Sequence, residues 1–233
     1  DFGKQGVAPS HPELLDFLAS ELIRGGWKLK PIHKLIMLSA VYRQSGESNP
    51  AAAKADPDNQ LMWRRRAVRL DAEAIRDTLL AVSGTLDKTM FGKGTLNQAI
   101  PRRSIYLTVK RGNLIPMLQL FDAPDAIQSI GHRDVTTVPP QALALMNSPL
   151  ARQLAEKFAK RIQSTPSMEP EKVVDTAYAT ALSRPPTDAE RQQMVDFINK
   201  QTASYGEDGK AMERAVADFC QLMLCLNEFI FID

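Results

Sequence analysis

Residues 63–86, WRRRAVRLDAEAIRDTLLAVSGTL, carry the longest helical pattern in the chain and decide the predicted fold. We predict a helix from about residue 59 to residue 83, with a break near Arg66 and with Gly84 as its C-terminal stop. Its apolar residues recur at helical spacing and form one stripe, which comprises Val68, Ala72, Ile75, Leu79 and Val82. The stretch therefore predicts a core helix against which the rest of the chain packs.

Charged residues gather on a second face of the same predicted helix. Arg69, Glu73, Arg76 and Asp77 fall at positions i, i+4, i+7 and i+8, where Glu73 reaches both arginines. One interpretation is an ion-pair ladder that stabilises the helix by about 0.2–0.5 kcal/mol per pair. A second is a buried ion-pair network that fixes the register of the helices. A third is an anion or acidic-sugar site, in which Arg66, Arg69 and Arg76 present their guanidinium groups to a ligand.

Helical patterns continue on both sides of this stretch and predict a mainly α, multi-helix fold. A capping box at Ser10 and Glu13 begins the first helix, which ends at Gly25. A second capping box lies at Thr187 and Glu190, and Ser148 is a predicted cap. We expect eight or nine helices and a surface loop at 44–58; beyond the central helix, the helical segments are 12–24, 32–43, 114–121, 141–146, 150–162, 171–182, 187–202 and 211–227.

Two short segments differ from this helical pattern. Residues 105–109 and 134–139 carry β-branched residues, and they predict a small two-stranded β ribbon packed over the helices. A basic patch flanks the first of them and is typical of a protected strand edge; it comprises Arg102, Arg103, Lys110 and Arg111.

The 233 residues suffice for one large domain. We predict a single mainly helical domain over residues 1–233, with sub-units 1–94 and 139–233 bridged by residues 95–138. The opening DFGKQG is typical of the interior of a longer protein, so we expect the chain to be truncated at its N-terminus. The apolar tail EFIFID is expected to dock on the core.

Composition excludes several classes of partner. Hydrophobic residues make up 44% of the chain, charged residues 24%, and the net charge is +2, so nothing favours nucleic acid. No apolar run approaches the roughly 18 residues of a membrane helix, and we expect no membrane span in this segment. Cys220 and Cys225 are five residues apart on a predicted helix, too far for a disulfide, and are interpreted as buried free thiols. Haem-attachment and paired zinc motifs do not occur, so we predict no cofactor in this chain.

The sequence does not predict a catalytic residue. The opening DFG lacks the other motifs of a protein kinase, and no G-x-S-x-G motif occurs. Three dispersed histidines do not form a zinc site. His132, next to Arg133 in GHRD, is the histidine most suited to a site. The candidate ligand-binding residues are therefore Arg66, Arg69, Glu73, Arg76, Asp77, His132 and Arg133.

Several blocks of the chain occur in the order of a known family. These blocks include YRQS at 42–45, the central stretch at 61–87, RRSIYLTVKR at 102–111, TTVPPQALALMNSP at 136–149 and SRPPTDAERQQMVDF at 183–197. With them, the chain resembles the planctomycete domain of unknown function numbered 1553. The resemblance spans nearly the whole chain.

The resemblance implies a setting rather than a reaction. It implies the C-terminal part of an exported multi-domain protein, periplasmic or at the cell surface, whose neighbouring domains include a companion domain numbered 1549 and often a cytochrome c haem domain. We therefore predict a non-catalytic structural or interaction module, which positions these domains or binds a surface glycan. One alternative is part of an enzyme acting on polysaccharide, with a site completed by a neighbouring domain. Another is a docking module for the cytochrome c domain.

Overall fold

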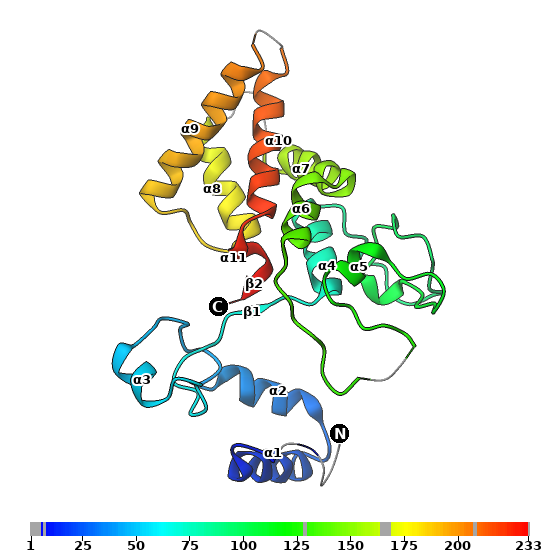
Figure 1. The fold of residues 1–233 in the computed structure, drawn as a ribbon, viewed down its shortest axis with the longest axis vertical. Coiled ribbons are helices and arrows are strands. Elements are labelled where there is room, and N and C mark those ends of the chain that lie inside the picture. The colour runs from blue at the N-terminus through cyan, green and yellow to red at the C-terminus, as the bar shows by residue number, and fades with distance from the viewer. Residues whose placement is uncertain (1–5, 7, 128–129, 164–168, 207–208, 233) are drawn as a thin grey trace. The chain divides into compact units, whose positions relative to one another are not determined.

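The chain forms two compact units, residues 1–68 together with residue 233, and residues 69–232. The computed structural model describes residue 6 and residues 8–127, 130–163, 169–206 and 209–232. This described part contains eleven α-helices and one short two-stranded sheet, and Figure 1 shows their arrangement within each unit. The mainly α fold class is confirmed, with more helices than the eight or nine expected. The sequence-based division at residues 94 and 139 stays a prediction.

The N-terminal unit contains α1 (Pro12–Arg24), α2 (Leu29–Leu38) and α3 (Pro50–Ala55). α1 ends at Gly25 as predicted, and Gly26 turns the chain with a φ of 65°. The predicted capping box at Ser10 is wrong, because the cap residue is His11 and makes no side-chain cap. α3 was missed within the expected loop. The Asn49 side chain caps it, accepting from the backbone N–H groups of Ala51 and Ala52.

The predicted central helix is shorter than expected, since α4 spans only Ala72–Val82. The chain before it is irregular because Asn59 and Met62 adopt positive φ angles. The Asn59 side chain bonds the backbone N–H and carbonyl of Arg64, which replaces helical hydrogen bonds there. Of the predicted apolar stripe, Val68 is 56% exposed, and the other four residues are buried.

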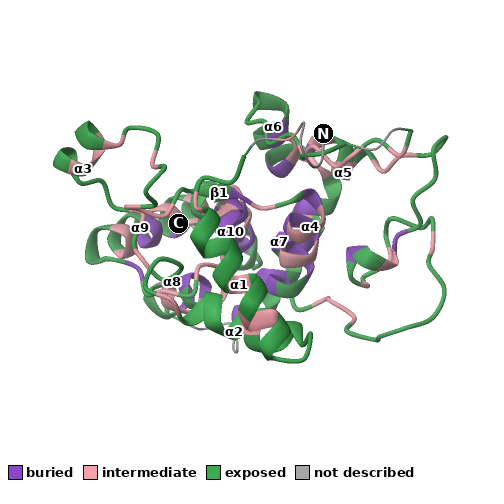
Figure 2. Cartoon of the chain, turned by 90° about the horizontal axis from the view of Figure 1, so that it is seen from below, coloured by how far each residue is buried: buried purple, intermediate pink, exposed green. Residues whose placement is uncertain are grey.

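The second unit is built around α10 (Ala211–Leu224), which packs against α7 (Pro149–Ile162), α8 (Pro170–Ala181) and α9 (Asp188–Ser204) (Figure 1). Apolar residues at helical spacing line their facing sides, and Phe158, Ile198, Val216 and Phe219 are fully buried. α4 packs on α7, so its stripe joins the same core. Figure 2 shows the buried faces of α4, α7 and α10.

Local capping signals in this unit are confirmed. The Ser148 hydroxyl accepts from the backbone N–H of Ala151 at the start of α7. Thr187 and Glu190 form the predicted capping box of α9. Arg184 also pairs with Glu190, and these contacts lower the pKa of Glu190 to about 2.

The C-terminal tail docks on the core as expected. α11 (Asn227–Ile230) leads into β2 (Phe231–Ile232), and Phe229 and Ile230 are buried. β2 pairs with β1 (Val68–Arg69), and the backbone N–H of Leu70 donates to the Ile230 carbonyl at 2.8 Å. Cys220 and Cys225 are free thiols, the first buried and the second half-buried.

The predicted small two-stranded ribbon is present, but β1 and β2 form it, and the two segments predicted to be its strands are not strands. Residues 104–106 form a 3₁₀ turn, η2 (Ser104–Tyr106), and Leu107 makes only an isolated bridge with Thr95. The backbone N–H of Ser104 donates to the Asp77 carboxylate on α4 rather than to a neighbouring strand. No strand forms at 134–139, where α6 (Pro139–Asn147) begins instead. The second short helix of this region, α5 (Pro116–Leu120), lies within the segment predicted to be helical.

Gly84 ends α4, and its replacement tests how that end is packed. Gly84 has a φ of 75°, and a Cβ atom there would lie 3.0 Å from Cδ of Arg161. Arg161 donates to the carbonyls of Ala81 and Val82 at the helix end. We expect Gly84→Ala to lower the free energy of unfolding by about 1–2 kcal/mol, measured by urea denaturation. Gly112→Ala is the control, because its Cβ would meet nothing within 4 Å; equal effects would contradict the prediction.

Candidate functional site

The predicted charged face does not exist as one surface. Arg69 lies in β1, before the helix begins, while Glu73, Arg76 and Asp77 lie on α4. The expected pairing of Glu73 with Arg69 and Arg76 is wrong, since Glu73 pairs with Arg133, 60 residues away. The charged residues make separate contacts with the irregular chain that follows α4.

Arg76 is a buried anchor for residues 98–104. Its guanidinium donates to the carbonyls of Gln98 at 3.1 Å, Ile100 at 2.5 Å and Arg102 at 3.0 Å. It also donates to the Ser104 hydroxyl at 3.1 Å, and only 3% of the residue is exposed. Burial lowers the pKa of Arg76, which the nearby Asp77 carboxylate partly opposes. Four of the five N–H donors of this guanidinium are thus engaged within the chain.

Asp77 holds the same segment from the next position of α4. Its Oδ1 accepts from both the backbone N–H and the hydroxyl of Ser104, each at 2.7 Å. Arg103 approaches Oδ2 only to 3.9 Å and is largely exposed. Asp77 therefore fixes η2 to the helix.

Arg69 forms a second anchor, to the chain after α5. It donates to Asp122 Oδ2 at 2.6 Å and to the Phe121 carbonyl at 3.3 Å, with its side chain 2% exposed. Asp122 adopts a φ of 61° and also accepts from the backbone N–H and hydroxyl of Thr136. Partial burial raises the pKa of Asp122, but the hydrogen bonds from Thr136 and the charge of Arg69 outweigh it, so the pKa lies below its ordinary value.

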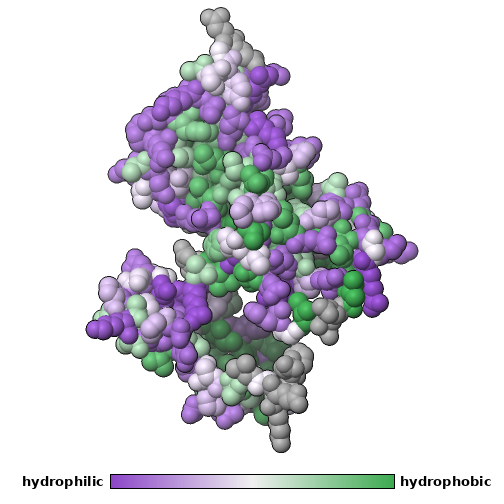
Figure 3. Space-filling model, in the orientation of Figure 1, coloured by the Kyte–Doolittle hydropathy of each residue, from purple (hydrophilic) through white to green (hydrophobic). Residues whose placement is uncertain are grey.

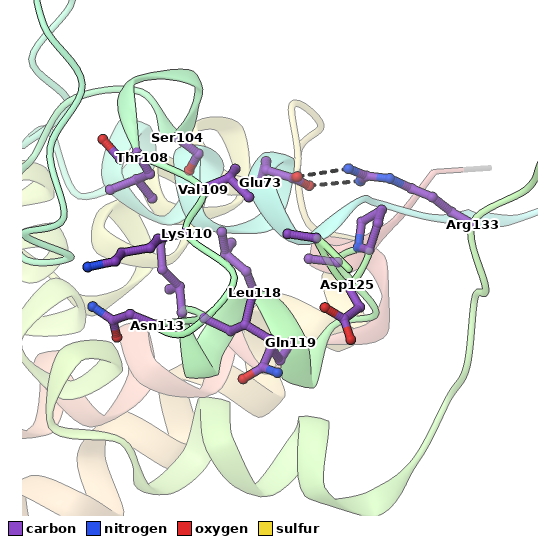
Figure 4. A pocket seen from close by; sticks show the side chains of 16 residues that line it. Glu73, Ser104, Thr108, Val109, Lys110, Asn113, Leu118, Gln119, Asp125 and Arg133 are labelled. Carbon is purple, nitrogen blue, oxygen red and sulfur yellow. Dashed lines mark hydrogen bonds and ion pairs between the residues drawn. The ribbon is translucent and has the colours of Figure 1, made fainter. Parts of the chain in front are cut away.

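Glu73 and Arg133 form the most exposed of these pairs. Two parallel hydrogen bonds of 2.8 Å join the carboxylate to the guanidinium, drawn as dashed lines in Figure 4. Asp71 lies 3.5 Å from the same guanidinium. The hydrogen bond from Arg133 holds the pKa of Glu73 below its usual range.

The remaining predicted site residues do not join this group. Arg66 belongs to the N-terminal unit and is exposed. The backbone N–H of Leu61 chiefly lowers the pKa of Asp56 there, and the charge of Arg66 adds to the effect. His132 is exposed beside Arg133. Within the described ranges, no cluster of histidine, cysteine or carboxylate side chains could hold a metal ion.

A pocket of about 290 Å³ lies beside the Glu73–Arg133 pair (Figure 4). Apolar side chains line part of it, among them Leu107, Leu114, Ile115, Leu118 and Ala123. Its polar lining includes Thr108, Lys110, Asn113, Gln119 and Asp125. Figure 3 shows hydrophobic and hydrophilic side chains interspersed over α5 and the surrounding loops. This mixture is typical of a ligand pocket.

Several residues that matter here carry no recognisable signal in the sequence. Asp122, Ser104 and Thr136 complete the anchors, and buried Gln141 donates to the Leu120 carbonyl at 3.0 Å. Each is a single polar residue, and its hydrogen-bond partner lies 14 to 53 residues away in the sequence. Helical spacing cannot reveal such contacts.

These contacts define a mainly helical module whose strongest charged interactions are internal. The chain belongs to the family described as a protein of unknown function, DUF1553 (PSD1), whose family model matches residues 1–198. The resemblance seen in the sequence is thereby confirmed. No curated protein and no solved structure matches the chain. Among the described helices, none has the length and apolar character required to cross a membrane.

Proposed function

We propose that the chain is a non-catalytic structural or interaction module of a multi-domain protein. The observation that carries the proposal is that Arg69 and Arg76, two of the three arginines expected to serve a ligand, are engaged by the protein itself. Arg76 and Arg69 together hold residues 98–104 and 121–122. Such contacts give a long irregular segment a defined surface, which is the requirement for positioning a neighbour.

The carboxylates of the pocket support this proposal over glycoside hydrolysis. Hydrolysis of this kind requires a carboxylic acid whose pKa is raised, so that it protonates the leaving oxygen. Glu73 has the opposite shift, because its two oxygens accept from Arg133. Asp125, the second carboxylate that lines the pocket, is exposed. Glu73 therefore lacks the environment of a general acid.

The partners we propose are neighbouring domains of the same polypeptide. This setting, and the export to the periplasm or cell surface that accompanies it, rests on the family resemblance alone. A haem domain is one such neighbour under this proposal.

Replacing both pocket carboxylates tests whether the module is catalytic. We expect Glu73→Gln with Asp125→Asn, made in the natural polypeptide, to leave any polysaccharide hydrolysis unchanged, because neither group transfers a proton. Reducing-sugar release measures the rate, and a thermal melt confirms that the variant is folded. A rate at least 100-fold lower with an unchanged melt would overturn the proposal, since removal of a general acid has about that effect or more.

A further inference from the structure

We propose that the pocket beside Glu73 and Arg133 binds an extended peptide segment of a partner protein through one large aliphatic side chain, with an acidic residue on one side of it and a basic residue on the other. The proposal deepens the interaction role proposed above and rests on it.

The floor of the pocket fits an apolar side chain. Leu107 is 8% exposed and contributes to it, together with Leu118 of α5 and Ala123. A volume of about 290 Å³ is at the small end of the range for ligand pockets. It suits one side chain and its backbone rather than a larger part of a partner domain. Burial of one leucine-sized side chain contributes about 1.5–3 kcal/mol.

Amide and hydroxyl side chains surround this floor without internal partners. Within the described residues, the side chains of Asn113, Gln119 and Thr108 make no hydrogen bond to protein, although all three line the pocket. A side-chain amide offers both donors and an acceptor, as a peptide backbone does. All three side chains are exposed and open to water, and an extended peptide would take the place of that water while its side chain occupies the floor.

Two opposite charges lie at the two sides of the pocket. Figure 4 shows Lys110 and Asn113 on one side, and Asp125 and Arg133 on the other. Glu73 and Arg133 neutralise each other, so Lys110 and Asp125, whose Oδ1 also accepts from the backbone N–H of Ile127, are the charges left for a ligand. Their placement is complementary to a carboxylate and a cation that flank the buried side chain. Each residue of an extended chain spans about 3.3 Å, so flanking residues two positions from the anchor reach outward on both sides.

A charge-swap experiment on the whole chain tests this assignment. The probes are four blocked pentapeptides: Glu-Ala-Leu-Ala-Lys and its reverse Lys-Ala-Leu-Ala-Glu, and Glu-Ala-Ala-Ala-Lys and its reverse Lys-Ala-Ala-Ala-Glu. Binding is followed by perturbation of amide NMR signals at residues 107–126. We expect the wild-type chain to prefer one order at least fivefold, and to lose at least tenfold in affinity when leucine is replaced by alanine.

The matched protein variant is Lys110→Glu with Asp125→Lys, which changes two exposed side chains and should leave the thermal melt unchanged. We expect it to exchange the preference between the two peptide orders. Equal binding of leucine and alanine peptides, no exchange of preference, or no binding at millimolar peptide would overturn the proposal. Binding of a neutral oligosaccharide in place of the peptides would also overturn it.

Failure of this proposal differs from failure of the proposed function. If no peptide binds and hydrolysis is unchanged in the Glu73→Gln, Asp125→Asn variant, only the proposed peptide site is rejected. A loss of hydrolysis in that variant overturns the non-catalytic role itself.

Discussion

Arg76→Met is expected to lower the free energy of unfolding by about 3 kcal/mol, measured by urea denaturation at pH 7. The substitution keeps an apolar stem but removes hydrogen bonds to three carbonyls and one hydroxyl. A net hydrogen bond to a charged group contributes about 1.5–3 kcal/mol, and four that share one side chain are not additive. Methionine also avoids the free-energy cost of burying the guanidinium charge, and this gain offsets part of the loss. The expected net change is therefore smaller than the sum of the four hydrogen bonds.

The loss of stability caused by Arg76→Met should be confined to one part of the chain. We expect faster amide hydrogen exchange in residues 98–107, which Arg76 holds against α4, and little change in α9. Arg103→Met is the matched control, since Arg103 is exposed and lies 3.9 Å from Asp77. We expect it to change the free energy of unfolding by less than about 0.5 kcal/mol. If both arginines gave the same small effect, Arg76 would not anchor the segment.

Asp122→Asn is expected to lower the free energy of unfolding by about 2 kcal/mol at pH 7. Asparagine tolerates the positive φ of this position and nearly preserves the shape of the side chain, so the change tests the charge. Removing one partner of a buried ion pair costs about 3–5 kcal/mol, because the other charge stays buried. We expect less here, because the Asp122 side chain is 17% exposed and retains Thr136 as a partner.

The pH dependence of this pair gives an independent check. Because the pKa of Asp122 is depressed in the folded state, its contribution is complete above the unfolded value of about 3.9. The contribution is lost as the pH falls through the lower folded value. The gap between wild type and Asp122→Asn should therefore be full at pH 7 and shrink below about pH 4. Asp134→Asn, at an exposed position, should show no such gap. A gap constant with pH would exclude the charge of Asp122 as its origin.

Local signals in the sequence predicted the helices well and the charged site poorly. Ser148 and the Thr187–Glu190 box act within three residues, so sequence spacing determines them. The extension of the central helix before Ala72 was wrong, because Asn59 bonds Arg64 and Leu70 pairs with Ile230. Helical propensity and apolar spacing were outweighed there by contacts that satisfy the backbone in another way.

The sequence by itself determined the mainly α class, the main core helices with their caps, the docking of the apolar tail and the family. These follow from interactions between near neighbours and from apolar periodicity, both of which can be read along the chain. Tertiary structure alone decided that Glu73 meets Arg133, that Arg69 meets Asp122 and that Arg76 holds residues 98–104. The physical reason is that a guanidinium pairs with whichever acceptors the folded chain brings to it, here 22 to 60 residues away, and no local pattern encodes that choice.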